Sequence, residues 1–281
     1  MSRKKIFGTF AVIALSGATW FGYQHFFYVE TDNAQVSAHV LMLSSRVNGT
    51  IQSVLVDENQ KVKRGDVLAQ IDTSDYSTAS QAAQSQVASL EARLMEAETN
   101  FKRASDLLKS QAISQEKFDG AQAAFKDGGA KLRQARAQAD QANLNVSYTK
   151  IIAPSDGVIA RKSVEPGQFV PAGQPLFGFV TSNERWITAN FKETELAGIV
   201  SGRPVEIEVD ALPSRSFHGS VDSISPSTGA LFSLLPPDNS TGNFTKVVQR
   251  VAVRIKLNDL NANDIEALHA GLSALVKIKI R

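Results

Sequence analysis

Two segments of this 281-residue chain repeat each other, and the repeat constrains the fold more than any other feature. Residues 47–68 align with residues 155–176 without a gap, at a constant offset of 108 positions. The identical pairs are Gly49/Gly157, Ile51/Ile159, Val56/Val164, Gln60/Gln168, Val62/Val170, Gly65/Gly173 and Leu68/Leu176. Each copy reads as a strand, a turn and a second strand, and neither copy can bury its apolar face alone. The repeat therefore predicts one small β-sandwich built from two separated halves.

The segment between the two halves carries a heptad pattern. Apolar or small residues recur at steps of three and four along two arms: Val87, Leu90, Leu94, Ala97, Phe101, Ala104 and Leu108, then Phe118, Ala121, Phe125, Gly128, Leu132, Ala135, Ala139, Ala142 and Val146. This spacing is typical of the a/d seam of a coiled coil. Residues 73–148 are therefore predicted to form an antiparallel α-helical hairpin that turns near residues 110–114. A pair of ordinary core helices is the alternative, although those need a wider apolar face. At Gly128 the two helices are expected to approach closely.

The N-terminus reads as a membrane anchor. Three basic residues, Arg3, Lys4 and Lys5, precede an uncharged apolar run over residues 6–23. As a helix this run is about 27 Å long, close to the thickness of the hydrocarbon layer. The basic flank predicts a cytoplasmic N-terminus, with the rest of the chain across the membrane. A cleaved signal peptide and a buried core helix are the alternatives.

The C-terminal part predicts an antiparallel β-barrel. Alternating or β-branched apolar runs occupy residues 186–191, 205–209, 247–257 and 274–280, between glycine and proline turns. Residues 37–43 are expected to join them. The predicted fold class is mainly β with an inserted α-helical hairpin. Its domains are an anchor (1–28), a split sandwich (45–72 with 149–180), the hairpin (73–148) and a barrel (29–44 with 181–281).

These features together resemble a known family. The two half-motifs resemble a biotinyl-lipoyl domain, and their separation by a hairpin behind an anchor resembles the HlyD-like membrane fusion proteins, the periplasmic adaptors of export systems. Residues 31–36, 190–194 and 230–250 resemble its EmrA-type branch. The resemblance implies a periplasmic body on a single-pass inner-membrane anchor. The hairpin departs from the resemblance, because it is shorter than is usual in that branch.

The same resemblance implies partners. An adaptor of this branch links a major-facilitator drug transporter of the inner membrane to a TolC-like outer-membrane channel, as a trimer or hexamer. An adaptor for an aromatic-acid exporter or an ABC-type secretion system is the alternative. A structural spacer of the cell envelope without a transport function is a third interpretation.

The composition argues against catalysis and against nucleic-acid binding. The chain has 30 basic and 28 acidic residues, which is too balanced for a nucleic-acid binder. It has no cysteine, and its four histidines lack the spacing of metal ligands. A carrier domain would need a modified lysine on the turn between its halves, and here the hairpin replaces that turn. No enzyme activity, cofactor or metal is therefore expected.

The hairpin turn carries the best candidate site. Arg103, Leu107 and Ser114 match, by spacing, the tip motif of adaptors that dock on a TolC-like channel. Arg103 offers a fork of donors, Leu107 an apolar knob, and Ser114 a helix cap. The alternative is a solvated Arg103 and a Ser114 that acts only as a cap.

A loop of the predicted barrel is the second candidate. Phe232, Leu234, Leu235 and Phe244 lie among proline and glycine residues, and exposed apolar loops often mark contact surfaces. The expected partner is a neighbouring protomer or the transporter. Packing of the loop against the barrel is the alternative.

Overall fold

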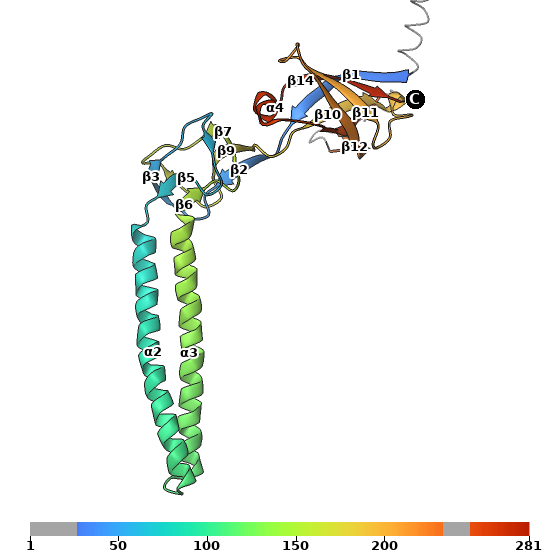
Figure 1. Cartoon of the computed structure of the whole chain (residues 1–281). Coiled ribbons are helices and arrows are strands. Elements are labelled where there is room, and N and C mark those ends of the chain that lie inside the picture. Colours follow the sequence, from blue (N-terminus) through green and yellow to red (C-terminus); the bar gives the residue numbers. More distant parts are fainter. Residues whose placement is uncertain (1–26, 233–247, 281) are drawn as a thin grey trace, which may run out of the picture. The chain divides into compact units, whose positions relative to one another are not determined.

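The computed structural model describes residues 27–232 and 248–280, and these residues form two compact units. One unit contains residues 40–180, and the other contains the described residues before position 40 and after position 180 (Figure 1). Among the described residues, no helix combines the length and apolar character needed to cross a membrane. The predicted anchor lies almost wholly outside them. Tyr28, expected at the end of the anchor, is instead the first residue of a barrel strand.

The predicted sandwich is present and contains two four-stranded sheets. The first has the order β2 (Val40–Ser44), β9 (Pro175–Thr181), β7 (Gly157–Lys162) and β4 (Lys61–Val62). The second has the order β6 (Lys150–Ile152), β5 (Val67–Ile71), β3 (Gly49–Val54) and β8 (Phe169–Val170). Both halves of the repeat contribute strands to each sheet. Their apolar side chains form one core, in which Leu68 and Leu176 are fully buried.

The two halves exchange equivalent hydrogen bonds, which confirms the repeat. Three backbone hydrogen bonds from one half to the other each have a counterpart displaced by 108 positions. The N–H to O=C pairs are Ile51–Gln168 (2.8 Å) with Ile159–Gln60 (3.0 Å), Gly65–Ala153 (2.9 Å) with Gly173–Ser45 (2.8 Å), and Asn59–Ile159 (2.7 Å) with Gly167–Ile51 (2.8 Å). Each half therefore completes the turns of the other, so neither half is a complete folding unit.

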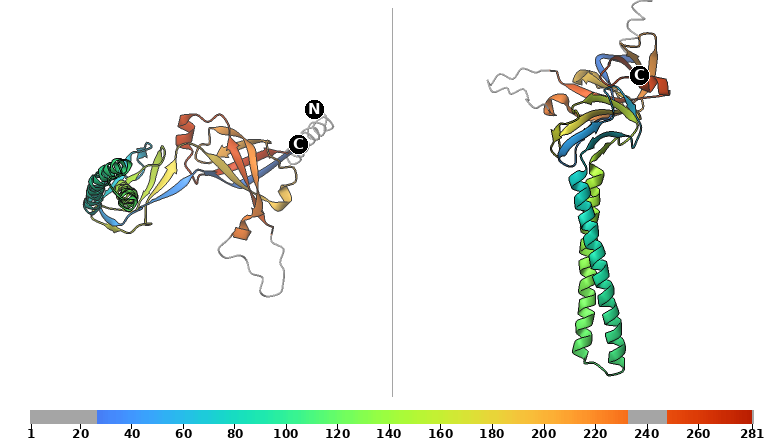
Figure 2. Two further views of the ribbon diagram at one scale, coloured as in Figure 1. Left: turned by 90° about the horizontal axis from the view of Figure 1, so that it is seen from below. Right: turned by 90° about the vertical axis from the view of Figure 1, so that its left-hand side faces the viewer.

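The predicted hairpin leaves the sandwich after β5 and returns before β6. Helices α2 (Ser74–Lys109) and α3 (Gln115–Tyr148) run antiparallel and side by side (Figures 1 and 2). The seam is confirmed: Leu132 is buried, and a Cβ on Gly128 would lie 3.3 Å from Leu94 Cδ1. Close approach at Gly128 is thus observed as expected.

Polar contacts fix the register of the two helices. Arg136 donates to Glu91 across the pair at 2.7 Å. Near the sandwich, Ser80 donates to Asn143 Oδ1 at 2.6 Å. Together with the alternating seam, these bonds define a single antiparallel alignment.

The second unit is a closed barrel with the strand order β1-β10-β13-β12-β11-β14. Its strands are β1 (Tyr28–Ser37), β10 (Trp186–Lys192), β11 (Pro204–Val209), β12 (Ser216–Thr228), β13 (Arg250–Leu257) and β14 (Ser273–Lys279). Short helices η1 (Glu193–Glu195), η2 (Gly229–Phe232) and α4 (Ala262–Ala267) lie in its connections. The four expected barrel strands are present, whereas β12 was not predicted.

One expectation about the barrel is wrong. Residues 37–43 were assigned to it, but the barrel ladder ends at Ser37, which pairs with Trp186. Strand β2 instead pairs with β9 of the sandwich, with Val40 opposite Val180. The apolar run of β2 suits a strand of either sheet, so only its pairing partner decides which sheet it joins.

Candidate functional site

The hairpin turn is closed by its own backbone. Gln111 adopts a left-handed conformation with φ of 58°, a conformation that ends many helices. Its N–H donates to Leu108 O at 2.9 Å, and the Ala112 N–H donates to Leu107 O at 2.9 Å. These two bonds form the Schellman arrangement, which satisfies the last carbonyls of α2. The backbone of the turn therefore satisfies the last carbonyls of α2 by itself.

Ser114 caps the returning helix. Its Oγ accepts a hydrogen bond from the Lys117 N–H at 3.4 Å, as a serine at the N-cap does. Its side chain is also exposed. The capping role considered from the sequence is thus present, and it leaves the hydroxyl accessible.

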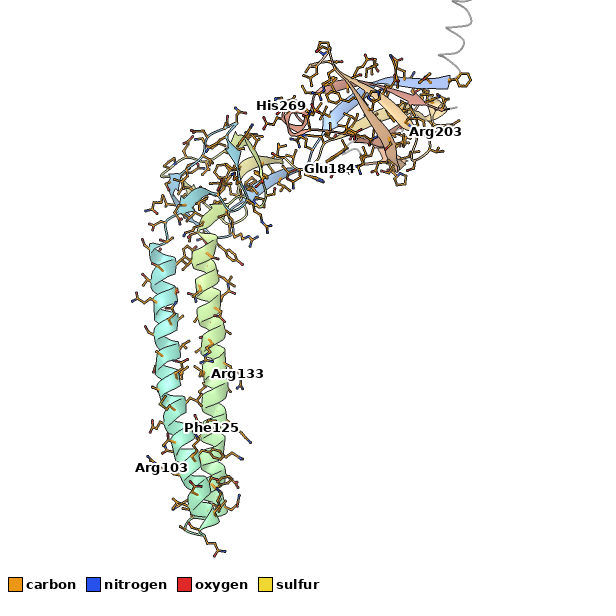
Figure 3. All side chains as sticks on the ribbon, viewed as in Figure 1. Arg103, Phe125, Arg133, Glu184, Arg203 and His269 are labelled. Carbon is orange, nitrogen blue, oxygen red and sulfur yellow. The ribbon has the colours of Figure 1, made fainter. Side chains whose placement is uncertain are left out.

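Arg103 and Leu107 lie one turn apart on α2 and share one face of the helix. Leu107 is 46% exposed, a large fraction for a leucine. Arg103, labelled in Figure 3, is exposed and makes no hydrogen bond or ion pair with any residue that the structure describes. The hairpin tip, defined here as residues 103–114, therefore presents an unpaired guanidinium beside an apolar side chain.

An aromatic cluster stiffens the hairpin next to the tip. The Phe101 ring stacks on Phe125 with centroids 5.6 Å apart and lies 5.5 Å from the Phe118 ring. Aromatic pairs at such distances add to the stability of the apolar seam. The cluster holds α2 and α3 together directly before the turn.

Two groups of predicted residues are not described. Arg3, Lys4 and Lys5 lie outside the described residues, as do Leu234, Leu235 and Phe244. Phe232 is the last residue of η2. These predictions therefore remain predictions.

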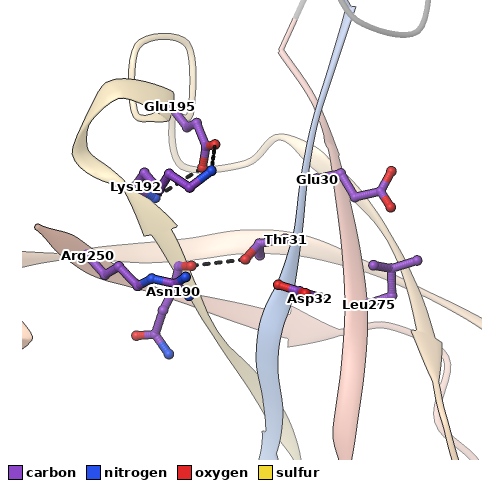
Figure 4. Close-up of a pocket in the computed structure, with 8 residues that line it drawn as sticks. All are labelled: Glu30, Thr31, Asp32, Asn190, Lys192, Glu195, Arg250 and Leu275. Atoms are coloured by element: carbon purple, nitrogen blue, oxygen red, sulfur yellow. Dashed lines mark hydrogen bonds and ion pairs between the residues drawn. The ribbon is translucent and has the colours of Figure 1, made fainter. Parts of the chain in front are cut away.

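A second site, which the sequence analysis did not identify, is a pocket of about 680 Å³ in the barrel unit (Figure 4). The residues that line this barrel pocket are Glu30, Thr31, Asp32, Asn190, Lys192, Glu195, Arg250 and Leu275. Three of its contributing segments are those that carried the resemblance: residues 31–36, 190–194 and 230–250. The shared resemblance of these three segments was the signal that could have pointed to the pocket. The sequence does not show, however, that the segments meet in space.

The barrel pocket is polar, and its walls are joined by hydrogen bonds. The Thr31 hydroxyl donates to Asn190 O at 3.0 Å and links β1 to β10. Lys192 Nζ lies 3.2 Å from Glu195 Oε1. Among the residues described, no group of three or more histidine, cysteine, aspartate or glutamate side chains is arranged to hold a metal. The pocket therefore offers charge and hydrogen bonds rather than a metal site.

Comparison with known proteins identifies the family. Residues 39–182 match the family described as RND MFP, barrel-sandwich hybrid domain, and residues 185–230 match the CusB-like beta-barrel domain. The colistin resistance protein EmrA of Acinetobacter baumannii is 32% identical, over 100% of this chain and 96% of its own length. The multidrug export protein EmrA of Haemophilus influenzae is 33% identical, over 99% of this chain and 84% of its own length.

A solved structure shares the fold. The periplasmic adaptor protein EmrA superposes with a TM-score of 0.50 at 19% identity, covering 90% of this chain and 99% of that chain. The fold, the two domain matches and the relatives agree with one another. The chain belongs to the HlyD-like membrane fusion proteins, in the branch of the EmrA periplasmic adaptors.

Proposed function

We propose that this chain is the periplasmic adaptor of a tripartite multidrug efflux pump. It links a major-facilitator transporter of the inner membrane to a TolC-like outer-membrane channel, and it acts as a homo-oligomer, a trimer or a hexamer. The residues before strand β1 anchor it in the inner membrane, with the body in the periplasm. The names of the relatives, multidrug export protein and colistin resistance protein, support the export role. Members of the family are structural components, so the transporter supplies the energy.

The observation that carries this proposal is a hairpin held at one end and exposed at the other. At the held end, Gln70 Nε2 donates to Thr149 Oγ1 at 3.1 Å, and the Tyr76 hydroxyl donates to Asn48 O at 2.7 Å. At the other end, Arg103 and Leu107 are exposed. A stiff arm with a free polar and apolar end suits docking on a second protein.

The test is a charge reversal at the tip. Arg103→Asp changes an exposed, unpaired side chain, so the free energy of unfolding should change by less than about 0.5 kcal/mol. On a partner that offers carbonyl or carboxylate groups, the same change should cost about 2 kcal/mol or more of docking free energy. We therefore expect drug export to fail in cells that express the variant at normal level, while the transporter still co-purifies with it.

Arg93→Asp is the matched control. Arg93 is exposed on the same helix and forms no hydrogen bond or ion pair with a described residue, but it lies ten residues, or about 15 Å, from Arg103. Its reversal should leave export intact. Equal damage from both variants, or normal export with Arg103→Asp, would contradict a docking role for the tip.

Co-purification from membranes tests the choice of partners. We expect a major-facilitator transporter among the proteins bound to the full-length chain. Recovery of an ATPase in its place would support the ABC-type alternative. Unchanged drug susceptibility of a strain that lacks the gene would contradict a role in drug efflux.

A further inference from the structure

The charges of the barrel pocket leave one negative and one positive group without a partner. Lys192 is paired with Glu195 at 3.2 Å, and Glu30 lies 3.9 Å from Lys277. Asp32 and Arg250 are exposed, and neither forms a hydrogen bond or ion pair within the described parts of the chain. The pocket is therefore dipolar, with a single unpaired charge of each sign.

The two charges come from different walls. Figure 4 shows Glu30, Asp32 and Leu275 on one side of the pocket, and Arg250, Asn190 and Lys192 on the other. A ligand that carries both a cation and an anion would meet a group of opposite charge on each side of the pocket. A ligand with one sign of charge would pair with only one of these two groups.

The lining also limits the chemistry of the ligand. Leu275 is the only apolar side chain among the eight lining residues, whereas pockets for drug-sized molecules are mostly apolar. None of the eight residues is aromatic, so a quaternary ammonium group would lack the aromatic cage that binds such groups in other proteins. A primary ammonium, with three N–H donors, can instead use the carboxylates of the acidic wall.

The strand register shows which end of the barrel holds the pocket. Lys192 at the end of β10 pairs with Arg250 at the start of β13, and Glu30 near the start of β1 pairs with Lys277 near the end of β14. The pocket thus lies at the end where the chain enters β1. The proposed anchor ends before strand β1, which starts at Tyr28, two residues or about 7 Å of strand before Glu30. With that anchor in a bilayer, the pocket lies close to the phospholipid headgroups.

We propose that the barrel pocket binds the phosphoethanolamine headgroup of a membrane phospholipid, with its ammonium at Asp32 and its phosphodiester at Arg250. A phosphodiester carries one negative charge and a primary amine one positive charge, which matches the two unpaired side chains. The choice of a lipid over a free zwitterion rests on the anchor in the proposed function. Headgroup binding would hold this end of the barrel against the membrane surface.

The first experiment titrates soluble headgroups into the full-length chain, purified and delipidated in dodecyl maltoside. We expect calorimetry to show binding of glycerophosphoethanolamine, and binding of glycerophosphocholine and glycerophosphoglycerol weaker by about tenfold or more. Asp32→Asn and Arg250→Gln should each weaken glycerophosphoethanolamine binding by about tenfold. Equal affinity for the three headgroups, or no effect of either variant, would overturn the proposal.

Two controls carry the same changes of charge outside the pocket. Asp210→Asn removes a negative charge beyond the opposite end of β11, and Lys256→Gln removes a positive charge far along β13 from Arg250. Neither should alter binding. Thermal unfolding by circular dichroism should be similar for all four variants, because each changes an exposed side chain.

The second experiment distinguishes the source of the headgroup. The full-length chain is placed in nanodiscs with equal amounts of phosphatidylethanolamine and phosphatidylcholine, and the lipids retained on extraction are identified by native mass spectrometry. Enrichment of phosphatidylethanolamine that Asp32→Asn abolishes supports the proposal. Headgroup binding in solution without such enrichment would overturn the lipid assignment. Failure of the chain to fractionate with membranes would instead contradict the proposed anchor, while the titration still reports on the pocket.

Discussion

Two glycines of the repeat occupy equivalent places where the sandwich leaves no room for a side chain. A Cβ on Gly49 would lie 2.6 Å from Ile71 Cγ2, and a Cβ on Gly157 would lie 2.4 Å from the Phe179 ring. Gly157 is 108 positions after Gly49, and Phe179 is 108 positions after Ile71. The identity of these glycines in the two halves therefore has a packing cause, since each lets a strand lie directly on a large buried side chain.

Replacement of Gly157 by alanine tests this packing. The new methyl group would meet both the fully buried Phe179 ring and Val180 O at 2.5 Å, and the buried backbone cannot move away easily. We expect the sandwich to lose about 2–3 kcal/mol of unfolding free energy, as in other overpacked cores. Urea denaturation measures this loss. Gly120→Ala on α3 is the control: a Cβ there would meet nothing within 4 Å, and the site does not have a positive φ, so the sandwich should keep its stability.

Asp72 stabilises the start of α2 by accepting two hydrogen bonds from Ser74. The Ser74 hydroxyl donates at 2.7 Å and the Ser74 N–H at 2.9 Å. Both bonds favour the carboxylate and hold the pKa of Asp72 below 3.8, with the hydroxyl as the larger cause. Because the folded pKa is lower than the unfolded pKa, this stabilisation is complete above about pH 4. It is lost as the pH falls through the folded value.

Removal of the Ser74 hydroxyl should raise the pKa of Asp72. In Ser74→Ala only the backbone bond remains, so we expect the NMR titration of the Asp72 carboxyl to move up toward 3.8. Ser77→Ala is the control, because its hydroxyl donates to Ser74 O and does not touch Asp72. An unchanged titration in Ser74→Ala would show that the hydroxyl bond does not form in solution.

At the scale of elements, the hairpin depends on a narrow seam of mostly small side chains. Leu132, Ala135 and Ala139 are the buried residues of α3, whereas α2 buries only Ser80 to the same degree. A two-helix coil has no third layer, so most seam residues remain partly exposed. Each buried seam residue therefore carries a large share of the association of the two helices.

Leu132→Asp should separate the helices. The leucine is 6% exposed, so aspartate there would place an unpaired charge in the seam at a cost of several kcal/mol. We expect rapid hydrogen exchange along much of α2 and α3. Gln134→Asp, on an exposed position two residues away, should leave the hairpin protected. Similar exchange in both variants would mean that the seam does not hold the hairpin together.

At the scale of the whole molecule, the two units have separate hydrophobic cores. The barrel core includes Phe191, Ile207 and Ile255, and the sandwich core includes Leu68, Phe177 and Phe179. The chain passes between the units only at residues 39–40 and 180–181. Since no core residue is shared, each unit should unfold as a separate cooperative unit.

A large-to-small substitution in the barrel tests this independence. Ile255 is fully buried, and Ile255→Ala should destabilise the barrel by about 2–5 kcal/mol through lost contacts and a cavity. Hydrogen exchange of the full-length chain should then accelerate in the barrel strands and stay unchanged in the sandwich and hairpin. Lys256→Ala, exposed and adjacent, should have little effect. Simultaneous loss of protection in both units would contradict separate folding.

The sequence by itself determined the features that depend on local period or on self-similarity. The heptad steps predicted which face of each helix is buried, because a helix places residues three and four apart on one side. The repeat at an offset of 108 residues predicted the sandwich, because each of the two similar halves has an apolar face that it can bury only against the other half. The break in the heptad pattern also predicted the position of the turn, whereas Arg103, Leu107 and Ser114 were chosen by resemblance to a tip motif.

Only the tertiary structure decided which distant strands pair. Strand β2 belongs to the sandwich because Val40 lies opposite Val180, and no local pattern records the partner of an edge strand. Strand β12 escaped prediction because polar residues, such as those at 222 and 223, interrupt its alternation. The barrel pocket joins Asp32, Asn190 and Arg250, which are far apart in the sequence. Their meeting depends on the closure of the barrel, because hydrogen bonding between strands is a non-local interaction that side-chain period does not specify.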